Sequence, residues 1–125
     1  MFDWLANPNR FNRITKKLQP FILFIAVITL ISGLYFGLYD SPKDYQQGDA
    51  VRIMYVHVPS AWLASFLYFS LAISCVFYLV WKHPLADLVS SSIAPIGALF
   101  SALTLVTGSL WGKPMWGTWW VWDAR

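Results

Sequence analysis

The chain has little charge and a single cysteine. Of its 125 residues, 12% are charged, which is about half the share of roughly 25% found in soluble proteins. All six acidic residues are Asp, so Glu is absent. With Cys75 as its single cysteine, the chain by itself cannot form an internal disulfide, a multi-cysteine zinc site or an iron–sulfur cluster.

Apolar and aromatic residues dominate instead. Hydrophobic residues make up 58% of the chain and aromatic residues 18%, a composition that excludes a disordered protein. The net charge of +3 is too small, and too scattered, for a nucleic-acid-binding surface. These features indicate an integral membrane protein, with one membrane domain over residues 1–125.

Three long uncharged stretches predict three transmembrane helices, at about 18–39, 59–81 and 88–111. The backbone of a segment in lipid must satisfy its own hydrogen bonds, so these are helices and not strands. The predicted fold class is therefore an all-α integral membrane protein. A polar turn at 82–87 should join the second and third spans into a tight helical hairpin.

The third span also contains small or weakly polar residues, which we interpret as helix-packing positions. They are Gly97, Ser101, Thr104, Thr107 and Gly108.

Lysine and arginine counts predict the orientation, because cytoplasmic flanks are enriched in them. Four precede the first span and two follow it: Arg10, Arg13, Lys16 and Lys17, then Lys43 and Arg52. We therefore expect the N-terminus and the turn with His83 in the cytoplasm, and residues 112–125 on the outer face. The first apolar run is too long for a cleaved signal peptide, so it should remain as a span.

Five tryptophans gather after the third span: Trp111, Trp116, Trp119, Trp120 and Trp122. An interfacial aromatic belt accounts for one or two of them, since Trp favours the membrane surface. The belt does not require five, nor the glycines set among them.

A helix that continued past Gly117 would place Trp116, Trp119 and Trp120 on one face, with Trp122 extending it obliquely. The result would be a flat aromatic shelf for a large planar apolar ligand. Gly117 would let that ligand approach the backbone closely.

His57 is the second candidate, at the outer start of the second span. Val58 precedes Pro59 and is biased away from helix, so we expect His57 in an extended or kinked leading segment. A lone histidine at a membrane boundary is most often an ordinary interfacial residue. An ionisable group at membrane depth is nevertheless a functional candidate, and a neutral imidazole is a common ligand of haem iron.

The run from Trp116 to Asp123 (WGTWWVWD) resembles the tryptophan-rich WWD signature of haem-handling proteins. The longer run 106–125, together with 44–49, 52–59 and 94–97, resembles the haem exporter protein C (cytochrome c maturation) family.

The resemblance implies a transport component and not an enzyme. It implies that b-type haem is bound transiently as cargo at the periplasmic face of the bacterial inner membrane, and is delivered to a periplasmic haem chaperone for c-type cytochrome biogenesis. It also implies partners: ATP-binding-cassette transporter subunits, a small single-span subunit and the lipid bilayer, with no nucleic acid.

For the site, the resemblance implies that His57 is the first of two axial histidines. The haem shelf would consist of Trp116, Gly117, Trp119, Trp120, Trp122 and Asp123. Arg125, Lys113 and Arg52 are candidates for pairing with the haem propionates. Family members have about twice this length and six spans, so we expect an N-terminal fragment, the first half of a six-helix bundle, with the second histidine outside it.

Two other classes stay open. A haem-containing membrane oxidoreductase subunit would need paired histidines inside spans, and the predicted spans contain none. A structural membrane subunit would use the tryptophans as a docking belt. Hydrolytic or transferase chemistry lacks support, because no Ser/His/Asp arrangement or P-loop is present.

Overall fold

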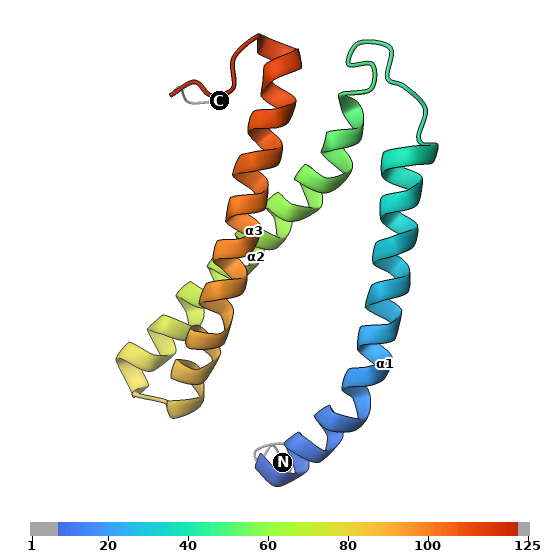
Figure 1. Ribbon diagram of the computed structural model, residues 1–125. Helices are drawn as coiled ribbons and strands as arrows, with labels where there is room; N and C mark the ends of the chain where they lie inside the picture. Colours follow the sequence, from blue (N-terminus) through green and yellow to red (C-terminus); the bar gives the residue numbers. More distant parts are fainter. Residues whose placement is uncertain (1–7, 123–125) are drawn as a thin grey trace. The chain divides into compact units, whose positions relative to one another are not determined.

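The computed structural model describes residues 8–122 (Figure 1). The chain forms two compact units, which divide between Asp40 and Ser41. The prediction of one membrane domain stays a prediction.

The first unit is one long helix, α1 (Pro8–Tyr35), followed by a π-helical turn, η1 (Phe36–Asp40). The four cations expected ahead of the first span therefore lie within the first turns of α1. Further along, the hydroxyl of Thr29 donates to the carbonyl of Ile25 at 2.8 Å. Polar side chains in this apolar stretch thus find partners inside the helix, as lipid requires.

The second unit is a helical hairpin of α2 (Val51–Trp81) and α3 (Pro84–Trp116) (Figure 1). Only Lys82 and His83 connect the helices. Lys82 adopts the left-handed conformation, with φ 51°, and its N–H donates to the Tyr78 carbonyl at 2.8 Å. The predicted turn at 82–87 was too long, because Pro84 presets a helical φ and starts α3 at once.

The prediction of an all-α membrane fold is confirmed. The helical segments Asn12–Asp40, Val51–Trp81 and Pro84–Trp116 are long and apolar enough to cross a membrane. Residues 8–122 contain no strand, and their β-type pairing is one isolated bridge between Asp44 and Gly48.

Helix α2 begins at Val51 and continues through Pro59, so His57 is helical and the extended alternative predicted for it is wrong, while the kinked alternative stays a prediction. Proline is tolerated in membrane helices because neighbouring groups satisfy the backbone that it frees. His57 consequently lies in the second turn of a helix long enough to span. The described helices that are long enough to span therefore contain one histidine, His57, and not a pair.

The helices do not enclose an apolar core. Among the described residues the buried side chains are polar, Ser41 and Ser60 at 9% and 5% exposure. Helices in lipid associate through close packing at small residues rather than through apolar burial. Gly97 of α3 is such a position, since a Cβ there would meet the Leu67 Cβ at 3.7 Å.

The loop between η1 and α2 is folded around Asp44. The backbone N–H of Asp44 donates to the Gly48 carbonyl at 3.2 Å, and the N–H of Gly48 donates to the Asp44 carbonyl at 3.0 Å. The side-chain Oδ1 of Asp44 accepts hydrogen bonds from the backbone N–H groups of Gln46 and Gln47, at 2.9 and 2.8 Å. Gly48 has a φ of 57°, a left-handed conformation that glycine adopts without strain.

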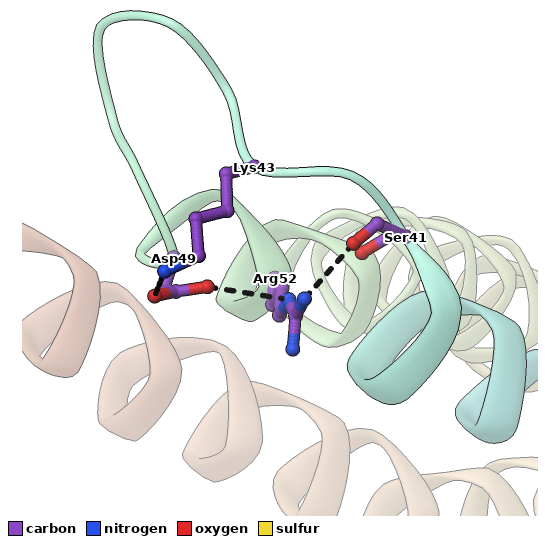
Figure 2. Close-up of polar contacts among 4 residues, drawn as sticks. All are labelled: Ser41, Lys43, Asp49 and Arg52. Carbon is purple, nitrogen blue, oxygen red and sulfur yellow. Dashed lines mark hydrogen bonds and ion pairs between the residues drawn. The ribbon is translucent and has the colours of Figure 1, made fainter.

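An ionic cluster closes the ends of this loop (Figure 2). Lys43 Nζ lies 2.7 Å from Asp49 Oδ2, and Arg52 Nη2 donates to the Ser41 carbonyl at 3.0 Å. The hydrogen bond from Lys43 lowers the pKa of Asp49 below its usual 3.8; desolvation opposes this shift, and the charges of Lys43 and Arg52 add to it. Since this pKa is lowered, the cluster is charged at neutral pH and is lost only as the pH falls through the lowered value.

Replacing Asp44 tests the loop. Asp44→Ala removes the acceptor of two backbone N–H groups, each net bond being worth about 1 kcal/mol. We expect hydrogen–deuterium exchange in the peptide covering residues 44–50 to accelerate roughly fivefold or more. Asp44→Asn keeps an Oδ1 acceptor and should exchange like the parent. Equal exchange in the alanine variant would contradict this role of Asp44.

Candidate functional site

His57 of α2 lies against two consecutive residues of α3. Its Nδ1 is 3.0 Å from Thr107 Oγ1. A Cβ added to Gly108 would lie 3.1 Å from His57 Cε1 and 3.6 Å from Nδ1. The imidazole therefore occupies space that any larger residue at 108 would fill. Sequence reasoning assigned Thr107 and Gly108 to packing alone and missed this contact, for which the sequence carries no signal.

Gly117 ends α3 and does not extend it. Its φ is 76°, and its N–H donates to the Lys113 carbonyl at 3.0 Å. Lys113 Nζ in turn donates to the Gly117 carbonyl at 2.9 Å. A glycine in the left-handed conformation is a common helix terminator. The predicted helical shelf is therefore wrong, since Trp119 and Trp120 do not continue the helix face of Trp116.

The chain beyond Gly117 turns back toward α3 at Gly112. A Cβ at Gly112 would lie 3.5 Å from both the Thr118 carbonyl oxygen and Cε3 of Trp116. Gly112 is itself buried. These are ordinary van der Waals distances, so the segment after Gly117 packs directly on α3 at Gly112.

The tryptophans form two edge-to-face pairs, the arrangement that aromatic quadrupoles favour. Trp111 and Trp116 have ring centroids 4.7 Å apart at 87°, and Trp120 and Trp122 lie 5.6 Å apart at 73°. Trp111 Nε1 also donates to Gln47 Oε1 at 3.0 Å. The loop is therefore tied to the first pair. Sequence reasoning missed Gln47, although it lies in the quoted run 44–49.

These residues surround a hollow of about 640 Å³, here called the tryptophan hollow. Its lining combines His57 with all five tryptophans, and adds small residues of α3 and its end: His57, Gly108, Trp111, Gly112, Trp116, Thr118, Trp119, Trp120, Val121 and Trp122. Ligand pockets commonly measure roughly 300–1,000 Å³. The structure thus brings the histidine and the aromatic residues together, although Trp119, Trp120 and Trp122 lie beyond the end of α3 and not on a helix.

The tryptophan hollow is not sealed. Trp116, Trp119 and Trp120 are each 50–57% exposed, and Trp122 is 92% exposed. A second hollow of about 670 Å³ shares Trp120 and Trp122 but is otherwise lined by Leu105, Val106, Ser109 and Leu110. It contains no metal-ligating side chain, so His57 distinguishes the tryptophan hollow.

The cations have other partners. Lys113 Nζ is 5.7 Å from the centre of the Trp119 ring, a cation–π arrangement. Arg52 bonds to the loop, as described above, and neither cation lines the hollow. Asp123 and Arg125 lie outside the described residues. Propionate contacts from Lys113, Arg52 or Arg125 stay predictions.

His83 lies in the connection between α2 and α3, at the opposite end of the hairpin from the tryptophan segment (Figure 1). It takes no part in the tryptophan hollow.

Comparison with known proteins shows extensive similarity. Residues 1–125 match the family described as "Heme exporter protein C". Proteins of that name from Bradyrhizobium diazoefficiens and Haemophilus influenzae are each 52% identical, over 97% and 100% of this chain and 46% and 52% of the relatives. The protein of that name from Escherichia coli K12 is 47% identical over 97% of this chain and 49% of its own length. The chain spans about half the length of these relatives.

Replacing Gly108 with a larger residue tests whether the His57 imidazole lies against it. In Gly108→Ala the new Cβ would lie 3.1 Å from Cε1, so the imidazole must shift. We expect the NMR signals of the His57 ring to move. Gly97→Ala is the matched control in the same helix, because its Cβ makes an ordinary contact of 3.7 Å with Leu67. Unchanged His57 signals in Gly108→Ala would show that the His57 imidazole does not contact residue 108.

Proposed function

The chain belongs to the heme exporter protein C family, and on that premise we propose that the full-length protein binds haem as cargo in the tryptophan hollow and exports it for c-type cytochrome assembly. The observation that carries this proposal is that His57 lines the same hollow as all five tryptophans. An iron ligand and a set of flat apolar surfaces are what a haem requires.

The donor set favours haem over a bare metal ion. Residues 8–122 contain no group of three or more His, Cys, Asp or Glu able to hold an ion. A porphyrin brings four nitrogen donors of its own, so it needs the protein only for axial ligands. His57 would supply one axial nitrogen, and the second would come from the remainder of the protein.

The tryptophans would hold the porphyrin faces. Their rings are large and apolar, and about half of each of Trp116, Trp119 and Trp120 remains exposed. When haem binds, these rings would become ordered against its faces and cover them in part. An acceptor protein could still reach the haem. Such a site suits a carrier that must release its ligand, and no bond in the haem need break.

A positively charged side chain lies close enough to the tryptophan hollow to pair with the propionates of the haem. Lys113 stands over the ring of Trp119, which lines the hollow, and is better placed than Arg52 to pair with a propionate. A charge-assisted hydrogen bond of this kind is stronger than a neutral one. We assign Lys113 this role in the proposed complex.

For orientation, we propose the N-terminus in the cytoplasm and the tryptophan segment on the periplasmic side. The cations of the first turns of α1, including Arg13 and Lys16, outnumber Lys43 and Arg52 beyond it. The proposed acceptor is a periplasmic haem chaperone, and the proposed partners in the membrane are ATP-binding-cassette subunits and a small single-span subunit.

The first test is the visible absorption spectrum of the detergent-purified full-length protein. His57→Ala should weaken or shift the Soret band. Retained haem should fall at least roughly tenfold, because even the loss of a group that only hydrogen-bonds to a metal-bound histidine costs that much. His83→Ala is the control, since His83 lies at the other end of the hairpin. An unchanged band in His57→Ala would remove His57 from the site, and no band in the parent protein would contradict haem binding.

The second test separates a haem site from an aromatic belt. Trp119→Leu and Trp120→Leu should each reduce haem retention about two- to tenfold, given 0.5–1.5 kcal/mol per aromatic contact. They should also lower the yield of assembled c-type cytochromes. Trp119→Phe should have no effect if the tryptophans form only a structural aromatic belt, but it should impair haem retention if Trp119 contacts haem.

The matched control is Trp62→Leu. Trp62 is 74% exposed on α2 and does not line the hollow. If Trp119→Leu and Trp120→Leu assemble cytochromes as well as Trp62→Leu does, the tryptophans are a structural belt.

A further inference from the structure

We propose that Thr107 is a positioning residue that sets the tautomer of His57, so that Nδ1 carries the ring proton and Nε2 keeps the lone pair that binds iron. This role presupposes that His57 ligates haem, as proposed above. It goes further by assigning the coordinating nitrogen and the residue that selects it.

The assignment starts from the single proton of the Thr107 hydroxyl. Thr107 Oγ1 lies 2.6 Å from the Leu103 carbonyl oxygen and 3.3 Å from that of Thr104. A carbonyl can only accept, so the proton between Thr107 and Leu103 must be the hydroxyl's own. Because the Leu103 carbonyl is the nearest of these acceptors, we infer that the proton points at it and that Thr107 faces His57 with oxygen lone pairs.

The proton on the imidazole follows from this. Thr107 Oγ1 is 3.0 Å from His57 Nδ1, and with its proton committed it can only accept, so Nδ1–H donates. A neutral imidazole carries one N–H, which leaves Nε2 unprotonated. In the opposite tautomer the Thr107 hydroxyl would have to turn toward Nδ1, 3.0 Å away, and give up its 2.6 Å hydrogen bond to the Leu103 carbonyl.

Thr107 acts through His57 and not on the ligand. It does not line the tryptophan hollow, whereas His57 and the adjacent Gly108 do. Gly108 leaves room for the ring, with Cε1 3.1 Å from where a Cβ would stand. One residue thus supplies the space and its neighbour supplies the orientation.

The chemical nature of the acceptor matters for a carrier. Metal-bound histidines generally donate their second N–H to a fixed acceptor, which orients the ring and raises its basicity. A hydroxyl is neutral, so it strengthens the ligand less than a carboxylate would. Thr107 therefore orients His57 without making it a ligand too strong to release haem.

The direct test needs no haem. In the haem-free full-length protein with ¹⁵N-labelled histidine, the signal assigned to His57 by its loss in His57→Ala should report protonation at Nδ1. Thr107→Ser keeps the hydroxyl and should preserve that signal. Thr107→Val removes it and should give the Nε2-protonated form or a mixture.

Thr104→Val is the matched control. Thr104 lies one turn earlier in α3, and its hydroxyl donates to the Phe100 carbonyl at 2.8 Å. With haem added, Thr107→Val should retain it about 10–100-fold less well, the usual effect of losing such a partner. Thr107→Ser and Thr104→Val should retain it like the parent protein.

An Nε2-protonated His57 in the parent protein, or identical tautomer and haem retention in Thr107→Val and Thr104→Val, would overturn the role of Thr107 even if His57→Ala loses the Soret band. If Thr107→Val changes the tautomer while His57→Ala keeps its Soret band, haem ligation by His57 has failed, and with it the role of Thr107 in binding haem.

Discussion

Inside the hydrocarbon, every backbone N–H and C=O must be bonded within the protein, and the rest of the structure depends on this constraint. It makes α1, α2 and α3 long helices and confines irregular backbone to their ends. The described chain departs from helix in the loop around Asp44, at the connection of Lys82 and His83, and in the segment from Gly117 onward. The candidate site therefore lies where α3 stops, with His57 reaching it from the second turn of α2.

The site combines a restrained ligand with accessible walls. His57 is held between the Thr107 hydroxyl and the bare backbone of Gly108, so its ring has a defined orientation. The tryptophan rings are about half exposed or more at Trp116, Trp119 and Trp120. A site built in this way can direct one nitrogen at iron while the porphyrin faces stay loosely covered. The proposed delivery of haem requires both properties.

The loop around Asp44 is connected to the site by hydrogen bonds and ring contacts. Asp44 holds the backbone of Gln47, and the Gln47 side chain accepts from Trp111, whose ring meets Trp116 edge to face. A continuous series of contacts therefore runs from the polar loop to the tryptophan hollow.

Length and hydropathy are local properties, so the sequence by itself determined the three helices, the α2–α3 hairpin and the grouping of tryptophans after α3. It also determined the family through the runs 106–125 and 52–59. It could not determine that Gly117 would end the helix, because glycine is compatible with both outcomes. Nor could it pair His57 with Thr107 or Gln47 with Trp111, which are 50 and 64 positions apart. Those pairings depend on the register in which α2 and α3 pack and on how the loop before α2 folds, and only the tertiary structure decides both.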